Sequence, residues 1–453
     1  MAMGKRKRRQ ESLFITADNL PRSDGHPFYQ KLNALLGEAG FDRWIEARCR
    51  PFYEQDETRG KPSIPPGVYF RMLLVGYFEG IDSQRGIAWR CADSLSLRAF
   101  LGVPLDQATS DHSTMSVTRR RIGAEVFDEV FRFVLAIAEE KRLLAGKTVG
   151  VDSTTLEANA AMKSIVRRDT GEDWQQYVTR LMRADGTIAA DDDEPTAEEV
   201  RLYDKKRKKK VSNEDWVSKT DPEARITKMK DGRTHLAYKA EHVVDLDSEI
   251  LLAAEIRPAD HADHDTLVDS VIEAKINLDE AGSDAQIEEV AADKGYHADA
   301  TLELAADLGL RTYVPEPKHK YDRVWTDKPA AYQRAVVNNR RRMARAKGKR
   351  LGRLRSERVE RSFAHVCDTG GARRSWLRGL EDVTKRYRLA AAAHNLARIM
   401  RLLFGIGKPR VLQDLASLVW LTHLAITAFW RVLTTAVCRL SFDSGRFITS
   451  AAH

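Results

Sequence analysis

The spacing of apolar residues changes near Lys147, and this change constrains the fold more than any other feature of the sequence. Residues 126–138 place apolar side chains at intervals of three and four, as on one face of a helix. Beyond Lys147, Val149 and Val151 share one face and Asp152 points to the other, a pattern typical of a strand with one side toward the core. The sequence therefore predicts a helical part followed by a part that contains a sheet.

Two further apolar stripes, at residues 28–39 and 68–75, predict additional helices before the sheet. Ser110 or Asp111 is a candidate cap for a short helix that ends in a triple arginine at residues 119–121. Three exposed arginines at a helix end can contact DNA phosphates, although such a cluster is as often an ordinary surface helix end. The N-terminal part is therefore expected to be all-helical.

The second part alternates strand and helix signals. Residues 235–245 and 250–256, separated by turn residues, predict a hairpin. Further strands are expected at 289–293 and 311–314. Helices are expected at 264–278, 299–308, 353–366 and 380–404. Hairpin strands followed by alternating helices and strands predict an α/β domain with a mixed sheet and flanking helices.

These signals divide the 453 residues into four predicted parts. Residues 1–25 are a basic arm, and residues 26–144 are a helical domain that binds DNA or a second subunit. Residues 145–404 are the sheet-containing domain, in which residues 160–232 break the pattern and are expected to be an insertion. Residues 405–453 are a helical C-terminal tail. Single cores stop growing at roughly 250–300 residues, so more than one domain is expected.

Clustered positive charge makes nucleic acid the expected partner. Lys and Arg number 74 against 66 Asp and Glu, a net charge of +8. Residues 317–355 are rich in Lys and Arg and contain only Asp322 and Asp327 as acids, and residues 5–9 form a second basic run. Such clusters attract polyanions, although either run alone is as well explained by a solvated charged face.

Cysteine use and hydropathy favour a cytoplasmic protein over a secreted or membrane protein. The four cysteines are widely spaced, so neither a disulfide framework nor a structural zinc site is indicated. No apolar segment follows the basic N-terminus, as a secretory signal would require. The longest uncharged stretch, residues 415–430, is shorter than the roughly 20 residues that span a bilayer, so a buried or partner-binding helix is expected there.

Three acids occupy positions that suit metal-dependent phosphodiester chemistry. Asp152 lies inside an apolar strand, where an unpaired carboxylate is costly. Asp293 ends another expected strand, and Glu360 lies on an expected helix beside its competitor Glu357. Hard ions such as Mg²⁺ prefer oxygen ligands, and two of them can stabilise both the attacking and the leaving oxygen. Taken singly, each acid has an ordinary structural explanation, such as a Lys pair, a turn or a helical salt bridge.

A second polar cluster, the sequence HADHD, contains His261, Asp263, His264 and Asp265. Imidazole and carboxylate groups of this kind can bind zinc. The cluster also has the character of a polar helix start with Asp260 as its cap, and this interpretation is favoured.

Several blocks of the chain, in order, resemble those of bacterial insertion-sequence transposases with a DDE triad. They are IPPGVYFRMLLVGYFEGIDSQRGIAWRCADSLSLRAFLG with SDHSTMSVTRRRI, then VGVDSTTLEANA, SKTDPEARITK with HLAYKAEHVVD, EEVAADKGYHA, and RSERVERSFAHV with WLRGLEDVTKRYRLAAAAHNLARIM. Any one block is weakly specific, whereas all of them in this order are strongly so. The resemblance covers roughly residues 60–405.

The resemblance implies a ribonuclease H-like catalytic core in which Asp152, Asp293 and Glu360 bind two divalent ions, Mg²⁺ or Mn²⁺. Glu360 is preferred over Glu357 because the block VERSF carries the resemblance. The resemblance also implies that the partner is double-stranded DNA, both as the terminal inverted repeats of the element and as the target. The implied reaction is nicking followed by strand transfer. A homodimer in the DNA complex is expected because two element ends must be handled together, and no small-molecule substrate is expected.

The candidate DNA contacts are basic residues near these acids or within basic clusters. They are Lys294, Arg358, Arg361, Arg119, Arg120, Arg121, Arg340, Arg341 and Arg342. Related enzymes often carry a Lys about one turn after the glutamate, where this chain has Cys367. That phosphate contact is therefore expected at Arg373 or Arg374 instead.

Two other functions fit the same residues. A ribonuclease H-like nuclease would cut DNA without joining it. A transposase-derived DNA-binding protein whose catalysis is unused would bind DNA without cutting, although the presence of all three acids argues against this second alternative.

Overall fold

The computed structural model describes residues 25–53, 63–189, 193–208, 211–229, 232–318 and 323–410. Nearly all of the expected basic arm, most of the expected C-terminal tail and the uncharged stretch at 415–430 lie outside these residues. Within the described ranges, no helix combines the length and the apolar character needed to cross a bilayer.

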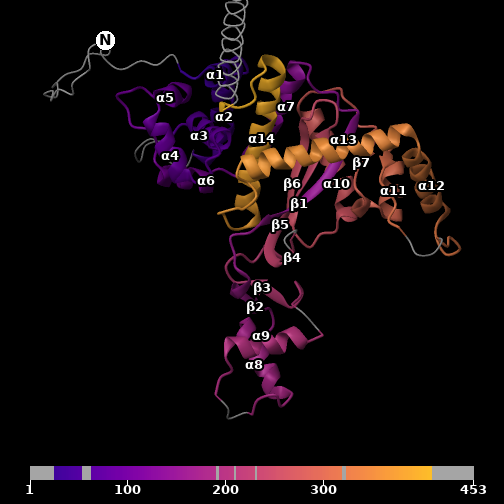
Figure 1. The fold of residues 1–453 in the computed structure, drawn as a ribbon. Helices are drawn as coiled ribbons and strands as arrows, with labels where there is room; N and C mark the ends of the chain where they lie inside the picture. The colour runs from indigo at the N-terminus through magenta and orange to yellow at the C-terminus, as the bar shows by residue number, and fades with distance from the viewer. Residues whose placement is uncertain are drawn as a thin grey trace, which may run out of the picture.

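A group of helices forms the N-terminal part (Figure 1). They are α1 (Pro27–Glu38), α2 (Phe41–Cys49), α3 (Pro66–Glu79), α4 (Gln84–Asp93), α5 (Leu95–Leu101), α6 (His112–Arg121) and α7 (Ala124–Glu140). Helix α3 is buried on most sides and packs against α2, α4, α5 and the C-terminal helix α14 (Leu380–Phe404). The Asp111 side chain caps α6 by accepting a hydrogen bond of 2.7 Å from the backbone N–H of Thr114, so the expected cap is confirmed for Asp111.

A mixed sheet forms the centre of the second part. Its strands are β1 (Thr148–Glu157), β4 (Arg225–Lys228), β5 (Thr234–Asp245), β6 (Leu251–Pro258), β7 (Glu289–Ala291) and β8 (Arg311–Tyr313). The order is β6-β5-β1-β7-β8, and β4 pairs with the first residues of β5 on the same side as β6. Strand β5 runs antiparallel to both β6 and β1, whereas β1, β7 and β8 run parallel to one another.

Helices cover both faces of this sheet. They are α10 (Asp263–Glu280), α11 (Asp299–Asp307), α12 (Ala330–Ala344), α13 (Ala346–Phe363) and α14. Asp152 on β1 contacts α13 through Arg355, and the next residue, Ser153, contacts α10 through Asp263. Because neighbouring side chains of a strand point to opposite faces, α13 and α10 cover opposite faces. The predicted fold class, a ribonuclease H-like mixed sheet with flanking helices behind a helical N-terminal region, is confirmed.

Helix α14 joins the two parts, because it packs along β6 and also against α3 and α7. Arg388 of α14 is almost fully buried at this junction. Its guanidinium lies 2.7 Å from Asp128 on α7 and 2.9 Å from Glu255 on β6. Burial raises the pKa of Asp128, and the neighbouring guanidinium opposes that shift. One buried cation therefore ties the helical part to the sheet.

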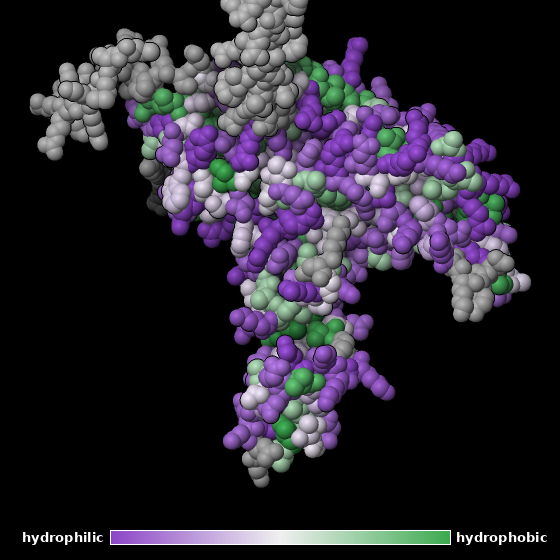
Figure 2. Space-filling model, viewed as in Figure 1, coloured by the Kyte–Doolittle hydropathy of each residue, from purple (hydrophilic) through white to green (hydrophobic). Residues whose placement is uncertain are grey.

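The inserted segment extends away from the sheet (Figure 1). It contains β2 (Ile165–Arg167), α8 (Trp174–Ala184), α9 (Ala197–Lys206) and β3 (Trp216–Ser218). Val178, Met182 and Val200 form a small core of their own between α8 and α9. The segment is shorter than the expected 160–232, because β4 lies inside that range and pairs with β5 of the main sheet. Figure 2 shows hydrophobic side chains at the surface near β2 and β3, where the segment leaves the body of the molecule.

Short single-turn helices complete the described chain. They are 3-10 turns at Arg50–Phe52, Met162–Ser164 and Lys294–Tyr296, and a π-helical turn at Ala364–Thr369 directly after α13. The basic stretch, for which no helix was expected before residue 353, forms α12 and the first half of α13. Only a narrow apolar strip, including Ala335, Val336 and Leu351, is buried there. So few apolar residues leave little periodic signal in the sequence.

Candidate active site

Asp152 lies on β1 with its carboxylate largely buried beneath α13. Its Oδ2 lies 2.6 Å from Nη1 of Arg355, and its Oδ1 accepts a hydrogen bond of 2.9 Å from the backbone N–H of Ser153. Burial raises the pKa of Asp152 to about 6. Arg355 opposes this shift, whereas the nearby carboxylates of Asp293 and Asp263 add to it. Asp152 is therefore a desolvated acid with other acids close by.

Asp293 follows the neighbouring parallel strand at the same edge of the sheet. The register pairs Gly150 of β1 with Ala291 of β7, so Asp152 and Asp293 come two residues further along on each side. Oδ1 of Asp293 accepts a hydrogen bond of 2.7 Å from the backbone N–H of Gly295. Asp293 thus opens the turn at residues 294–296, and its charge lies close enough to raise the pKa of Asp152.

Asp263 is a third acid at this edge, and the sequence placed it in the HADHD cluster, not with the catalytic acids. Its Oδ1 accepts a hydrogen bond of 2.7 Å from Oγ of Ser153 and lies 2.6 Å from Nζ of Lys239. A Cβ added at Gly295 would meet Asp263 Oδ2 at 2.8 Å and Asp293 Oδ1 at 3.0 Å, so both carboxylates lie close to Gly295. Asp263 therefore joins Asp152 and Asp293, and we call this part of the sheet the acidic edge.

The favoured interpretation of the HADHD cluster is corrected in part. Helix α10 does start there, at Asp263, but its N-cap is Ala262, with no capping hydrogen bond from a side chain. Asp260, the expected cap, instead lies 3.4 Å from Arg225 in an ion pair with β4. The alternative zinc site is not seen either, since the described residues contain no group of three or more His, Cys, Asp or Glu side chains placed to hold a metal ion.

Glu360 lies on α13, the helix that crosses β1 above Asp152. It is exposed, and its Oε1 accepts a hydrogen bond of 3.0 Å from Oγ of Ser356 on the same helix. Its neighbour Val359 packs against Gly150, two residues before Asp152. Glu360 therefore lies on the helix that covers β1, but in the described conformation it does not form a ready-made metal-binding group with Asp152 and Asp293.

Glu357, the competitor for the third acid, is engaged elsewhere. Its carboxylate pairs with Arg361, which also lies 2.9 Å from both carboxylate oxygens of Glu249. Glu249 belongs to the turn after β5, and the end of β5 pairs with the start of β1 at Val149. Arg361 therefore holds Glu357 on the side of the start of β1, away from Asp152 and Asp293.

Buried contacts hold α13 in place over β5 as well. The ring of His242, which pairs with Asp152 across β1 and β5, stacks on Phe363 with ring centroids 4.0 Å apart. Its Nδ1 lies 2.8 Å from Oγ of Ser362 and its Nε2 lies 2.7 Å from the hydroxyl of Tyr387 on α14. Burial lowers the pKa of His242 well below its usual value, so the ring is neutral. No motif in the sequence marked His242, because its partners lie far away in the chain.

Four of the expected DNA contacts are already held by other protein groups. Arg119 is half-buried and lies 3.5 Å from Asp382. Arg340 makes a two-pronged pair with Glu316 at 2.9 and 3.0 Å. Arg342 donates to the backbone oxygen of Thr312 at 2.9 Å, and burial lowers its pKa. The fourth, Arg361, is paired as described above. These contacts reduce the availability of their guanidinium groups for DNA.

The other expected contacts are more accessible. Lys294, Arg120 and Arg341 are exposed, and Arg121 is exposed beside the Tyr53 ring at 4.8 Å from its centroid. Arg358 is half-buried, with Nη1 buried and unpartnered among the described residues.

Helices α12 and α13 carry further exposed cations that the sequence placed in a basic stretch without singling them out. Arg334, Arg345, Lys349 and Arg350 are exposed and form no ion pair within the described ranges. Figure 2 shows a largely hydrophilic surface over α12 and α13. Together with Arg341, these residues make up the exposed basic surface of α12 and α13. Glu360 lies on α13.

The segment after α13 returns to β1. Cys367, which stands where relatives often have a lysine, is buried with its Sγ 3.7 Å from the hydroxyl of Tyr387. Arg373 donates a hydrogen bond of 3.0 Å to Oγ1 of Thr154, two residues beyond Asp152 on the same face of β1. Arg374 instead lies over the ring of Trp376. Of the two arginines, Arg373 is the one held beside the acidic edge.

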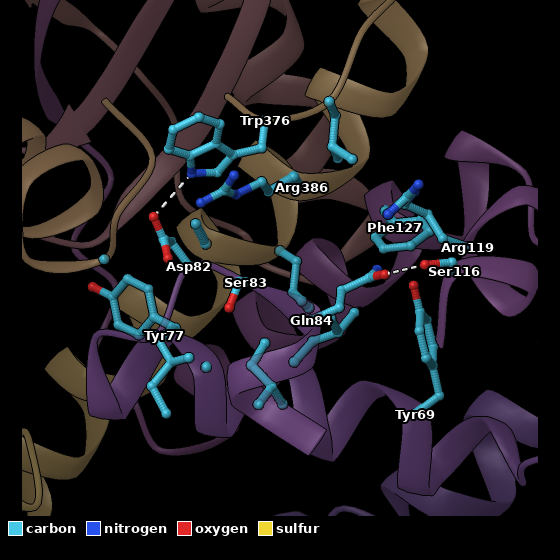
Figure 3. Close-up of a pocket in the computed structure, with 18 residues that line it drawn as sticks. Tyr69, Tyr77, Asp82, Ser83, Gln84, Ser116, Arg119, Phe127, Trp376 and Arg386 are labelled. Carbon is cyan, nitrogen blue, oxygen red and sulfur yellow. Dashed lines mark hydrogen bonds between the residues drawn. The ribbon is translucent and has the colours of Figure 1, made fainter. Parts of the chain in front are cut away.

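One cavity lies elsewhere, between the helical part and the segment that leads into α14 (Figure 3). It encloses about 520 Å³ and is lined by residues of α3, α4 and α14 together with Trp376. Nε1 of Trp376 donates a hydrogen bond of 2.9 Å to Asp82, and Oγ of Ser116 donates to Gln84 (Figure 3). None of the three predicted catalytic acids lines it. The cavity is therefore separate from the acidic edge.

Comparison with known families gives two matches. Residues 16–121 match the family described as Transposase domain (DUF772), and residues 172–396 match the family described as Transposase DDE domain. No curated protein and no solved structure matches the chain. The second match includes Asp293 and Glu360, whereas Asp152 falls between the two ranges. With both families in this order along one chain, the protein belongs to the DDE transposases of insertion-sequence type.

Proposed function

We propose that the protein cleaves double-stranded DNA at the ends of its mobile element and joins the freed 3′ ends to target DNA. Asp152, Asp293 and Glu360 serve as ligands of two divalent ions, Mg²⁺ or Mn²⁺. The observation that carries this proposal is the position of Asp152 on β1, beneath the helix that carries Glu360, with Asp293 just beyond the end of the adjacent parallel strand β7.

The chemistry of the donor set fits such ions. Asp293 and Asp263 both add to the raised pKa of Asp152, so carboxylates share this part of the sheet, and oxygen is the ligand that Mg²⁺ prefers. Burial raises the pKa of Asp152 to about 6, because a desolvated charge beside like charges is unfavourable without a compensating cation. A divalent cation supplies that compensation better than one guanidinium does.

Bound there, two divalent ions would supply charge stabilisation for the attacking and leaving oxygens of the phosphodiester. The protein's own residues bind and orient the DNA. Arg373, fixed beside Asp152 by Thr154, takes the phosphate contact that relatives make with lysine. Lys294 is exposed next to Asp293 and neutralises a further phosphate.

Two copies of the chain act together in the DNA complex, because both ends of an element must be cut and joined in one event. The exposed basic surface of α12 and α13 suits the DNA backbone. Cytoplasmic action on the bacterial nucleoid is the setting in which this reaction takes place.

A strand-transfer assay tests the proposal. The full chain is mixed with Mg²⁺, a labelled duplex that ends in the element's terminal repeat, and a target plasmid. We expect nicked ends and joined products, both lost when Mg²⁺ is removed. A nuclease of the same fold would yield nicks without joined products, and a DNA-binding protein with unused catalysis would yield neither while still retaining the duplex. Either result would overturn the proposed reaction.

A further inference from the structure

Arg355 of α13 occupies the carboxylate that the proposed function assigns to a metal ion. Its Nη1 lies 2.6 Å from Oδ2 of Asp152. Both side chains are shielded from solvent, with 14% and 20% of their surfaces exposed. A pair of this kind is short and charge-assisted, so a cation that approaches Asp152 must compete with the guanidinium.

The close contact depends on a residue without a side chain. A Cβ added at Gly150 would lie 3.2 Å from Cγ of Arg355 and 2.8 Å from Cγ2 of Val359. The aliphatic part of Arg355 therefore passes over Gly150 before the guanidinium turns to Asp152. This arrangement brings α13 near enough to β1 for its arginine to reach the acidic edge.

The guanidinium is only partly satisfied in this position. Its Nε is buried and has no hydrogen-bond partner among the described residues. A buried donor without a partner is unfavourable, so an acceptor that reaches Nε would stabilise the guanidinium. Because Nε has no partner, Arg355 can still donate hydrogen bonds to another acceptor group, such as a phosphate with its two oxygens.

Two of the three acids at this edge have an ion pair among the described residues. Arg355 pairs with Asp152 and Lys239 pairs with Asp263, whereas Asp293 has none. Lys239 is buried and already engaged, at 2.6 Å from Asp263 and 3.1 Å from the backbone oxygen of His261. Arg355 is therefore the cation whose departure would free Asp152 without disturbing the contact between α10 and β1.

We propose that Arg355 holds the cation position at Asp152 until DNA arrives, and that a DNA phosphate then draws the guanidinium away so that a metal ion can bind. This inference rests on the proposed function. It makes metal binding and DNA binding mutually reinforcing, because DNA supplies the alternative partner for Arg355 and metal supplies the alternative partner for Asp152. Such coupling is reciprocal, so each ligand raises the affinity for the other by the same factor.

The first test measures Mn²⁺ binding to the full chain without DNA. The electron paramagnetic resonance signal of free Mn²⁺ reports how much of the ion is bound. We expect Arg355→Gln to bind Mn²⁺ about tenfold more tightly than wild type. In this variant the metal ion no longer competes with a guanidinium for the Asp152 carboxylate. Arg353→Gln is the matched control, because Arg353 lies exposed on the same helix and forms no ion pair among the described residues. It should bind Mn²⁺ as wild type does. Asp152→Asn should lose the site.

The second test compares wild type with and without DNA, so its main result does not depend on how Arg355→Gln folds. Mn²⁺ affinity of wild type is measured with and without a duplex that carries the terminal repeat, and the same DNA with Asp152→Asn gives the Mn²⁺ bound by DNA alone. We expect the duplex to raise the affinity of the Asp152-dependent site about tenfold in wild type, and to have much less effect in Arg355→Gln.

The outcomes separate this inference from the proposed function. If binding depends on Asp152 but is equal in wild type and Arg355→Gln, and DNA does not change it, then Arg355 is a structural partner only and the inference is overturned. If no variant shows Asp152-dependent Mn²⁺ binding, with or without DNA, the metal site itself is absent and both proposals fall.

Discussion

The side chain of Val359 on α13 rests against Gly150 on β1. A Cβ added at Gly150 would lie 2.8 Å from Cγ2 of Val359, and it would also lie 2.7 Å from Cδ2 of Leu246. Strand β1 and helix α13 can approach closely only because no side chain stands between them. The same approach places the helix of Glu360 over the strand of Asp152.

Gly150→Ala should weaken both the fold and the catalytic edge. Adding a methyl group to a packed contact of this kind costs about 1–3 kcal/mol, and the resulting shift of α13 moves Glu360 away from Asp152. Urea unfolding measures the stability, and cleavage of labelled DNA measures the activity. Gly352→Ala is the control, since an added Cβ there meets nothing within 4 Å; it should raise stability by about 0.5–1 kcal/mol. Equal behaviour of the two variants would contradict this packing.

Arg388→Met should separate the helical part from the sheet. Removal of the guanidinium leaves Asp128 and Glu255 without their shared partner at a mostly buried junction, and a loss of about 3 kcal/mol is expected. Differential scanning calorimetry measures the change. Arg201→Met removes an arginine from an exposed pair with Glu198 and should cost less than about 0.5 kcal/mol. Similar losses in both variants would show that the junction is not tied by Arg388.

His394 on α14 should make the protein sensitive to acid. Burial lowers the pKa of His394 to about 3, whereas an unfolded histidine titrates near about 6.5. Between these values the unfolded chain binds one more proton than the folded chain at this residue, so stability falls as pH falls. His394→Leu should reduce the pH dependence of the unfolding free energy by about one proton at pH 4–6. Urea titrations at several pH values measure it, and an unchanged slope would refute the assignment.

The exposed basic surface of α12 and α13 should carry much of the salt dependence of DNA binding. Replacing Arg341, Lys349 and Arg350 together by Gln should lower the slope of log affinity against log salt by about 2–3, because each phosphate contact contributes roughly 0.9. Fluorescence anisotropy over a salt series measures the slope. Arg340→Gln is the matched control, since its guanidinium already pairs with Glu316. An equal loss per charge in the control would contradict the division into paired and free arginines.

Local periodicity was enough to predict most of the elements that carry the site. The alternation around Asp152 predicted β1, and the spacing of apolar residues predicted α14 with its observed bounds, Leu380–Phe404. Both segments bury a continuous face, and burial of that kind leaves a regular pattern in the sequence.

Contacts between distant residues were beyond such reasoning. Asp263 joins the acidic edge through Ser153 and Lys239, which are far away in the chain. Arg340 and Arg342 were expected to contact DNA, but Glu316 and Thr312 engage them once β8 and α12 pack together. A charged residue looks the same in sequence whether its partner is solvent, DNA or a distant side chain, so only the folded arrangement separates these cases.

The most direct measurement is the rate of Mg²⁺-dependent cleavage of a terminal-repeat duplex by Asp152→Asn, Asp293→Asn, Glu360→Gln and Glu357→Gln. We expect the first three to lose about a thousandfold or more, equivalent to about 4 kcal/mol of transition-state stabilisation, while their DNA binding is kept. Glu357→Gln should stay within about threefold of wild type, because its carboxylate is tied to Arg361 away from the acids. Undiminished cleavage by Glu360→Gln, or a loss at Glu357 in its place, would contradict the proposed triad.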